Sequence, residues 1–491
     1  HNTFALSENS SCNWIYIGDT WGSTAPLVSG NHLIEYNEFT GKTHPGKYIT
    51  IDGNATQQSQ HDTIRFNLFK NNGPRADNEK ESIRVGYSGI SKSSGHTVIM
   101  HNLFEDCDGD PEVVSIKSCD NIIKYNTFKS CLGTLSLRHG DRNLVEGNYF
   151  FGEGKTAQFT NSSNVTSTIG CGGIRVYGKD HKIVNNYFEG LTGSRWDAAL
   201  TITNGDVTNT SGSLSSHYLP ENVVIAFNTL VNNASNIEIG FDNNGNYSKA
   251  PKNCVLANNI VVEDSTSIVK SYSATSLAGV GFTGNMFYPT GTSTVGITHT
   301  TTQITVADPG LIKPTCVGAG CNQTTAARVF RLEAGSAAVD ASTGNYPEAA
   351  LDLEGFLRAG TKDIGAHEYS GGRTVSITAL SAANVGPNAV PLSYTYTYPG
   401  NTGIDDWRRK SAGIELYPNP AHGMIHIALS TEPEVNSEWV VINSLGAVVL
   451  KEVASRDKRQ HLQIEGLAPG IYHLQLRSGI GAQFNKSFIV Q

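Results

Sequence analysis

The stretch that decides the fold is Ile122-Ile123-Lys124-Tyr125-Asn126-Thr127-Phe128, in which β-forming residues lead into an Asn-x-Phe motif. A close copy, Leu144-Val145-Glu146-Gly147-Asn148-Tyr149-Phe150, follows after a short interval. The pattern recurs through the first part of the chain, with its Asn at positions 37, 67, 102, 126, 148, 186, 228, 259 and 285. Self-similarity of this kind is typical of a solenoid, so each copy predicts one coil.

The repeat also predicts how each coil is built. The shortest interval, from Asn126 to Asn148, fits one coil of short strands and turns, and the longer intervals imply inserted loops. In register, the Phe positions form an apolar stack inside. The Asn positions lie at a turn, where Asn tolerates the left-handed conformation and its amide bonds to the next coil. We therefore expect an all-β chain whose main unit is a right-handed single-stranded parallel β-helix.

Four regions follow from where the repeat is present and where it fades. Residues 1–305 are the β-helix domain, and residues 306–370, which end in Asp363-Ile364-Gly365-Ala366-His367-Glu368-Tyr369, are the C-terminal end of that unit. Residues 371–411 are rich in Ser, Thr, Gly, Asn and Pro and are interpreted as a linker. Residues 412–491 form a small C-terminal β-sandwich domain. Because Asn2-Thr3-Phe4 already fits the repeat, we expect a capping piece before His1.

Charge and hydropathy exclude two classes of function. The formal net charge of −8 and the pI near 6.0 exclude a basic nucleic-acid binder. No apolar run reaches the length of a membrane span. An acidic protein binds a polyanion only where positive charge is concentrated locally. In a solenoid such a site lies at inserted loops, which we expect around residues 73–93, 155–172 and 190–219.

Positive charge is concentrated in the coils between residues 84 and 175. Lys117 and Arg138 are separated by nearly one short coil, so we expect them to be stacked neighbours projecting from one face. Arg84 and Arg175 flank this pair. Like charges stacked on neighbouring strands lower stability, which favours a functional role. The sequence therefore predicts a basic strip for a polyanion.

A carboxylate pair lies next to this strip. Asp110 and Glu112 are two residues apart, so on a strand both side chains face the same way. Two such groups repel each other unless a cation lies between them, and oxygen ligands suit Ca²⁺. Taken alone, the cluster also fits a solvated acidic turn.

Residues 61–190 resemble polysaccharide lyase family 6, which contains alginate lyases and chondroitinase B. The motifs that carry the resemblance are Asn78-Glu79-Lys80-Glu81-Ser82-Ile83-Arg84-Val85-Gly86, Asp110-Pro111-Glu112-Val113-Val114-Ser115-Ile116-Lys117-Ser118 and Leu137-Arg138-His139-Gly140. The resemblance implies Ca²⁺ ligands at Asn78, Asp110 and Glu112. It implies a general base at Lys117, a general acid at Arg138, and substrate contacts at His139, Arg84, Arg175 and Tyr177. The family usually has Glu where this chain has Asp110, whose shorter side chain withdraws the ligand oxygen.

The implied reaction is β-elimination from a uronate, which removes the C5 proton and expels the 4-O-linked sugar. Ca²⁺ would neutralise the neighbouring carboxylate, and Lys117 would have to be neutral to take the proton. Arg138 would stabilise or protonate the leaving oxygen, a step that His139 or Tyr177 could share. We therefore expect an alginate lyase that acts on an acidic polysaccharide.

Three other interpretations remain open. A lyase of dermatan or chondroitin sulfate would use the same mechanism, although a sulfate-binding site should need more basic residues. A non-catalytic carbohydrate-binding β-helix would tolerate loss of Lys117 and Arg138. A β-helix hydrolase would need catalytic carboxylates and would leave no double bond in its product.

The last 80 residues resemble the sorting domain of type IX secretion. The motifs that carry the resemblance are Tyr417-Pro418-Asn419-Pro420 and Leu467-Ala468-Pro469-Gly470-Ile471-Tyr472. The resemblance implies that the type IX machinery of a Gram-negative bacterium is a partner, and that the protein is secreted or attached to the cell surface. A general β-sandwich binding module is the alternative.

Overall fold

The computed structural model describes residues 1–18, 29–54, 58–317, 329–370, 372–375, 377–391, 394–397, 414–429, 432–433, 435, 437–443, 447–478 and 481–491. The chain forms two compact units, His1–Tyr396 and Thr397–Gln491. No helix in these described ranges has the length and apolar character needed to cross a bilayer. The predicted class, an all-β chain with a parallel β-helix, is confirmed.

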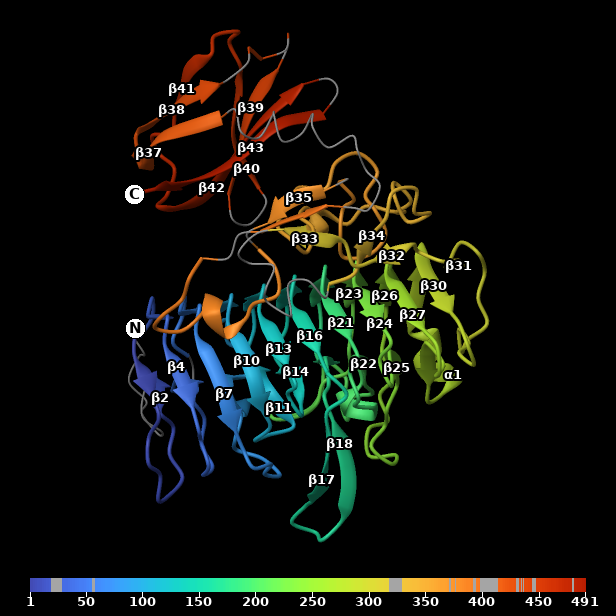
Figure 1. The fold of residues 1–491 in the computed structure, drawn as a ribbon. Helices are drawn as coiled ribbons and strands as arrows, with labels where there is room; N and C mark the ends of the chain where they lie inside the picture. Colours follow the sequence, from blue (N-terminus) through green and yellow to red (C-terminus); the bar gives the residue numbers. More distant parts are fainter. Residues whose placement is uncertain are drawn as a thin grey trace. The chain divides into compact units, whose positions relative to one another are not determined.

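Three parallel sheets run along the first unit, and each complete coil contributes one strand to each sheet, while β30 and β31 extend the first sheet beyond the other two (Figure 1). The first sheet contains β1 (Thr3–Phe4), β4 (Glu38–Thr40), β7 (Leu68–Asn72), β10 (Leu103–Cys107), β13 (Thr127–Lys129), β16 (Tyr149–Phe151), β21 (Tyr187–Glu189), β24 (Thr229–Val231), β27 (Ile260–Glu263), β30 (Asn285–Pro289) and β31 (Ile304–Val306). The second contains β2 (Ile15–Ile17), β5 (Ile49–Ile51), β8 (Ile83–Val85), β11 (Glu112–Lys117), β14 (Thr134–His139), β19 (Ile174–Val176), β22 (Leu200–Ile202), β25 (Ile237–Ile239) and β28 (Val269–Ser271). The third contains β3 (Leu33–Glu35), β6 (Thr63–Arg65), β9 (Val98–Met100), β12 (Ile122–Lys124), β15 (Leu144–Glu146), β20 (Lys182–Val184), β23 (Val224–Ala226), β26 (Cys254–Ala257) and β29 (Val280–Thr283).

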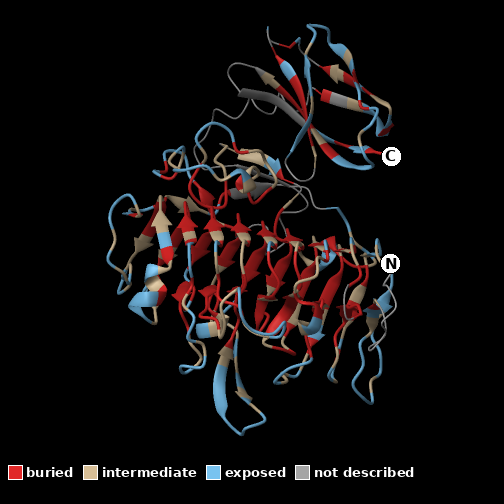
Figure 2. Cartoon of the chain, turned by 180° about the vertical axis from the view of Figure 1, so that it is seen from behind, coloured by how far each residue is buried: buried red, intermediate tan, exposed pale blue. Residues whose placement is uncertain are grey.

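The repeated Phe residues stack inside the coils as predicted. Phe104, Phe128 and Phe150 have ring centroids 4.7 Å apart, with the planes nearly parallel. This distance matches the spacing of neighbouring strands, about 4.8 Å. The interior of the coils is buried, as Figure 2 shows for the strands of the three sheets. Stacking of one coil on the next therefore supplies the core.

The repeated Asn residues form a continuous ladder of amides beside this stack. Asn126 Oδ1 accepts hydrogen bonds from the backbone N and Nδ2 of Asn102, both at 3.0 Å. The backbone N and Nδ2 of Asn126 donate in the same way to Asn148 Oδ1. The predicted bond to the next coil is confirmed. The predicted left-handed conformation, however, belongs to the preceding residue, for example Tyr125 at φ 54°. The side-chain amide of Asn126 thus bonds across the turn to the Lys124 carbonyl, and the residue between them adopts the left-handed conformation.

Inserted loops occur where they were expected. Residues 155–172 form a hairpin of β17 (Thr156–Thr160) and β18 (Thr166–Gly170), which projects from the coils (Figure 1). Two short 3-10 helices lie in the other insert regions, η1 (Ser88–Ile90) and η2 (Arg195–Asp197). The one α-helix of the described ranges, α1 (Ala274–Ala278), lies between β28 and β29.

The segment after the last coil packs back along the outside of the first sheet. Its elements are β32 (Leu311–Ile312), β33 (Thr315–Val317), β34 (Arg331–Leu332), η5 (Pro347–Ala349), β35 (Gly372–Val375), η6 (Ala382–Asn384) and β36 (Tyr394–Thr397). Leu380 and Val385 pack against Leu68 and Leu103 of early coils. The linker predicted over 371–411 therefore begins too early. Its polar composition also suits a covering segment with few apolar anchors, and residues 398–411 lie outside the described ranges.

The second unit is a small β domain whose strands pair mainly antiparallel. It contains β37 (Ile414–His422), β38 (Met424–Leu429), β39 (Glu438–Asn443), β40 (Val448–Val453), β41 (Arg459–Gln463), β42 (Gly470–Ser478) and β43 (Gly481–Val490). Its hydrophobic cluster around Trp439 is its own.

Candidate active site

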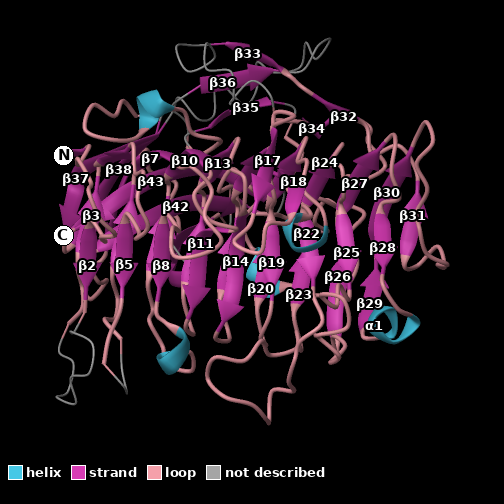
Figure 3. Cartoon of the chain, turned by 90° about the horizontal axis from the view of Figure 1, so that it is seen from below, coloured by secondary structure: helices cyan, strands magenta, loops and turns pink. Residues whose placement is uncertain are grey.

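The predicted site residues gather around the outer face of the second sheet, whose strands Figure 3 shows side by side. In β8 the first and third residues are buried and the middle side chain points outward, because side chains alternate along a strand. In register, Arg84, Ser115, Ser136 and Arg175 occupy one column of neighbouring strands. The two arginines thus flank a pair of serines, not the Lys117–Arg138 pair.

Lys117 and Arg138 are neighbours, but they are not directly stacked. Ile116 pairs with Leu137 while Lys117 pairs with His139, so a bulge places Arg138 as the extra residue between these two pairs. The expected register was wrong by one residue. The bulge turns Arg138 outward, where its side chain is 27% exposed, and leaves His139 buried.

Glu112 is the carboxylate that two residues of the basic strip, Arg138 and Arg175, contact. Its Oε1 lies 3.2 Å from Arg138 Nε and 3.5 Å from Arg175 Nη1. Ser136 Oγ donates to the same oxygen at 3.3 Å, and Ser115 donates to Oε2. Burial alone would raise the pKa of Glu112, but Arg138, Lys117, Arg175 and the Ser115 hydrogen bond outweigh it and lower the pKa to about 2.

Asp110 lies where a loop of one coil meets the start of the next strand. Its carboxylate accepts the backbone N–H of Glu112 at 2.9 Å and of Lys80 at 3.1 Å. Burial, with the charges of Glu81 and Glu112, raises the pKa of Asp110 to about 8. Asn78 is exposed in the loop that the Lys80 bond fixes.

Glu81 is a residue that the sequence interpretation missed. It is buried, and within the described ranges neither of its carboxylate oxygens accepts a hydrogen bond. Lys117 Nζ lies 3.6 Å from one oxygen and Lys47 Nζ lies 3.4 Å from the other. A third carboxylate beside Asp110 and Glu112 makes this corner rich in negative charge. Its position within the Asn78–Gly86 motif was the available signal.

Arg175 and Tyr177 lie against an aromatic group. Arg175 donates to Asp197 Oδ1 at 2.9 Å and to the Trp196 carbonyl at 3.2 Å, with its guanidinium 5.6 Å from the Trp196 ring. Trp196 Nε1 donates to the Tyr177 hydroxyl at 2.9 Å. Burial raises the pKa of Tyr177 to about 12, so the phenol keeps its proton at neutral pH.

Long loops bring two further rings that no local motif indicated. His217 lies 4.9 Å from the rings of both Tyr177 and Tyr247. It also lies 5.8 Å from the ring of His139. Burial, followed by the charge of Arg138, lowers the pKa of His139 well below its usual range, so its ring is neutral.

Arg84 is less available than its place in the column suggested. Its guanidinium is paired with the buried carboxylate of Asp52, and its side chain is 13% exposed. The cationic groups of this site are therefore Arg138 and Arg175 at Glu112 and Lys117 at Glu81.

Oxygen donors at the Asp110 corner fit the chemistry of Ca²⁺. No group of three or more His, Cys, Asp or Glu in the described ranges has the arrangement of a metal site, and the predicted set has only two carboxylates and one amide. Burial and the charges of Glu81 and Glu112 raise the pKa of Asp110, which reports repulsion among these three carboxylates. A hard divalent cation would relieve it. Glu112 would have to turn away from Arg138 to contribute.

Comparison with known families agrees with this fold. The chondroitinase B family model matches residues 23–315, more than half of the chain. The chain therefore belongs to the chondroitinase B family. The model of the secretion system C-terminal sorting domain matches residues 415–491, which indicates secretion or surface attachment through the type IX system.

Solved structures of polysaccharide lyase family 6 share the fold. The alginate lyase AlyGC is 28% identical with a TM-score of 0.52, over 66% of this chain and 40% of that one. A mutant of AlyGC is 25% identical with a TM-score of 0.54, over 74% and 41%. A trisaccharide complex of another family 6 alginate lyase, at 21% identity and a TM-score of 0.50 over 77% and 70%, shows the fold alone. This chain thus spans about 40% of the length of AlyGC. No curated protein matches it.

Proposed function

We propose that this chain is a polysaccharide lyase that cleaves alginate by β-elimination. The observation that carries the proposal is the pairing of Arg138 and Arg175 with Glu112 and of Lys117 with the neighbouring Glu81, on an otherwise acidic chain. Three cations at one partly open site suit a polymer with a carboxylate on every sugar. Membership of the chondroitinase B family and the likeness to AlyGC support the same reaction class.

Lys117 is the proposed base. Lys117 takes the C5 proton of the uronate, and the electron pair left behind forms the C4–C5 double bond as the C4–O bond breaks. Arg138 is partly exposed beside it and stabilises the negative charge that develops on the leaving oxygen. A guanidinium does not give up its proton readily, so a different group should supply it.

Tyr177 is the better proton donor of the two candidates. Its raised pKa keeps the hydroxyl protonated, and Trp196 occupies an oxygen lone pair and leaves the O–H free to point elsewhere. His139 is neutral, and its Nε2 forms a hydrogen bond with Ser88 Oγ at 3.2 Å, so this nitrogen is already engaged. The proton that leaves Tyr177 is replaced from solvent after release of the product.

Ca²⁺ is proposed as the cofactor, with Asn78, Asp110 and Glu112 as ligands. When bound, it would neutralise the carboxylate of the sugar that loses its proton. The support is the excess of buried carboxylate at this corner, to which Glu81 adds.

Dermatan or chondroitin sulfate is the second candidate substrate, because the matching family model is that of chondroitinase B. The charges at the site favour alginate instead. Glu112 partners Arg138 and Arg175, Asp52 partners Arg84, and Asp197 partners Arg175 again. Little positive charge is left to hold a sulfate in addition to each carboxylate.

The test is ultraviolet absorbance of the unsaturated product on alginate and on dermatan sulfate, with and without EDTA. We expect absorbance to rise on alginate and Lys117→Ala to abolish the rise. Lys129→Ala is the matched control, because Lys129 lies on the same coil and pairs with Glu105 at 2.7 Å away from the site. Activity that survives Lys117→Ala would refute the mechanism. A folded protein that binds these polymers without releasing product would favour a non-catalytic carbohydrate-binding role.

A further inference from the structure

The hairpin of β17 and β18 contacts a loop that lies three coils earlier in the solenoid. The hairpin lies between β16 and β19, whereas residues 73–82, here called the Asn78 loop, connect β7 to β8. In the first sheet β10 and β13 lie between β7 and β16, so β7 and β16 are roughly 14 Å apart. β17 and β18 form a two-stranded sheet of their own, outside the three sheets of the coils (Figure 1). Closure of the coils therefore does not require this hairpin.

The base of the hairpin is fixed to the coils. Lys155 Nζ lies 2.7 Å from Asp106 Oδ1 and 2.7 Å from Asp108 Oδ2. Ala157 and Ile169 pack against the core of the coils. The direction in which the hairpin projects is therefore set by charged and apolar contacts at its base.

The outer part of the hairpin makes two contacts with the Asn78 loop. The backbone N–H of Ser162 donates to Asp77 Oδ2 at 2.8 Å. The Phe159 ring lies 5.8 Å from the Arg75 guanidinium. Arg75 in turn donates through Nη1 to the Asp110 carbonyl at 3.1 Å. The hairpin, the loop and the Asp110 corner are thus joined by one series of contacts.

These contacts are next to Asn78, the exposed residue that is the proposed cation ligand of this loop. On one side of Asn78 the neighbouring Asp77 is held by the hairpin, and on the other side Glu79 pairs with Lys47. Ordering a flexible loop costs conformational entropy. An ion that binds a loop already held in place does not lose affinity to this cost.

We propose that the β17–β18 hairpin is a brace that holds the Asn78 loop against the Asp110 corner and so sets the affinity of this corner for Ca²⁺. Asp77, Arg75 and Phe159 are positioning residues, which act through Asn78 and do not contact the ion. This inference rests on the proposed function for the identity of the cofactor. It goes further, because no residue of the hairpin belongs to the proposed ligand set.

The test measures Ca²⁺ affinity by calorimetry on the full chain, after treatment with EDTA and its removal. Phe159→Ala is the decisive variant, because it changes no charge and no proposed ligand. Asp77→Ala removes a charge together with the acceptor of the Ser162 bond. Asp77→Asn removes the charge but keeps an acceptor oxygen. Comparison of the two Asp77 variants therefore separates the hydrogen bond from the charge.

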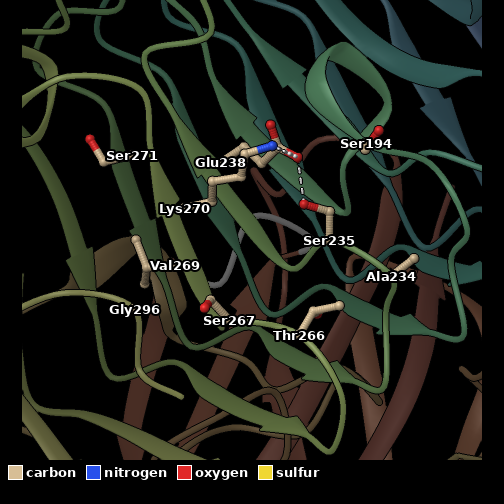
Figure 4. Close-up of a pocket in the computed structure, with 10 residues that line it drawn as sticks. All are labelled: Ser194, Ala234, Ser235, Glu238, Thr266, Ser267, Val269, Lys270, Ser271 and Gly296. Atoms are coloured by element: carbon tan, nitrogen blue, oxygen red, sulfur yellow. Dashed lines mark hydrogen bonds and ion pairs between the residues drawn. The ribbon is translucent and has the colours of Figure 1, made fainter. Parts of the chain in front are cut away.

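Two control variants leave the brace intact. Val165→Ala changes the end of the hairpin, where this side chain is 57% exposed. Lys270→Ala removes a charge at the other end of the second sheet, beside a cavity of about 440 Å³, where Lys270 Nζ lies 3.8 Å from Glu238 Oε1 (Figure 4). Hydrogen exchange of the backbone amides of residues 74–81, measured without Ca²⁺, reports the order of the loop. The urea midpoint reports the stability of the whole unit.

We expect Phe159→Ala and Asp77→Ala each to weaken Ca²⁺ binding about fivefold and to speed exchange in the loop. Asp77→Asn should bind more tightly than Asp77→Ala, and both controls should bind as the parent does. The inference is overturned if Phe159→Ala and Asp77→Ala bind Ca²⁺ as the parent does, which would leave the proposed function standing. A lower urea midpoint without faster exchange in the loop would also overturn it, because the hairpin would then serve stability alone.

The parent protein separates this inference from the proposed function. Weaker Ca²⁺ binding in both variants, with no unsaturated product from the parent, would refute the proposed lyase and support the brace. A parent that binds no Ca²⁺ would overturn the proposed cofactor and the brace together.

Discussion

Replacement of Asn126 by Asp tests the amide ladder, because it keeps the size of the side chain and removes its donor. Asn126 Nδ2 donates to Asn148 Oδ1 at 3.0 Å, to the Ile99 carbonyl at 2.9 Å and to the Lys124 carbonyl at 3.1 Å. A carboxylate in this place would face three acceptor oxygens. At about 1 kcal/mol for each lost hydrogen bond, we expect the free energy of unfolding of the β-helix to fall by about 3 kcal/mol or more, since burial of the charge adds to the loss.

Urea denaturation at pH 7, followed by circular dichroism, measures this loss. Asn253→Asp is the control, because Asn253 is exposed and makes only a 3.5 Å bond to Asn222. It should change the free energy of unfolding by less than about 0.5 kcal/mol. At lower pH the introduced carboxyl group takes up a proton and regains one donor, so the difference from the parent should narrow. An Asn126→Asp variant within about 1 kcal/mol of the parent would refute the reasoning.

Three further outcomes are expected. Ca²⁺ should raise the unfolding midpoint of the parent in a thermal-shift assay, and EDTA should reverse the increase. Asp110→Asn should remove this response to Ca²⁺. An equal response in the variant would exclude Asp110 as a ligand. Tyr177→Phe should lower kcat about 100-fold with a smaller change in KM if the phenol donates the proton, and a kcat near the parent's would exclude that role. Burial lowers the pKa of His181 to about 4, and its Nδ1 accepts the Asn143 N–H at 3.1 Å. Because an unfolded His takes up its proton near pH 6.5, the free energy of unfolding should fall by about 1.4 kcal/mol for each pH unit between about 6.5 and 4. His181→Gln should flatten this part of the urea-midpoint profile, and an unchanged slope would contradict the assignment.

The solenoid could be predicted from the sequence because an Asn recurs at the same position of each coil. Each Asn of the ladder hydrogen-bonds to the Asn of the next coil, so a change at one position would disrupt the bonds to both neighbouring coils. The same residue is therefore needed in every coil, and the repeat can be read from the sequence. The hairpin at 155–172 could be located as an insert for the same reason. The covering segment could not, because its contacts are with residues far away along the chain. Leu380, for example, donates its N–H to Thr127 Oγ1 at 2.8 Å.

The candidate site was predictable where residues lie on strands. Lys117 and Arg138 were brought together by the coil period, but the pairing interval grows by one residue at the bulge, so Ile116 pairs with Leu137 and Lys117 pairs with His139. The bulge at Arg138 has no signal in the composition of β14. His217 enters from a loop whose path depends on the whole fold. Such contacts follow from tertiary packing, and local sequence does not encode them.

The covering segment is synthesised well after the coils whose outer face it covers. The hydroxyl of Tyr149 is buried only when it reaches the Leu353 carbonyl, 204 residues later in the chain. At translation rates of roughly 5–20 residues per second, the outer aromatic face of the first sheet waits roughly 10–40 s for its cover. During that time a nascent chain that has already formed its coils exposes an apolar surface, which favours aggregation with other chains. A cell that exports this protein would benefit from keeping the nascent chain uncoiled, or shielded by a chaperone, until the residues around Leu353 have left the ribosome.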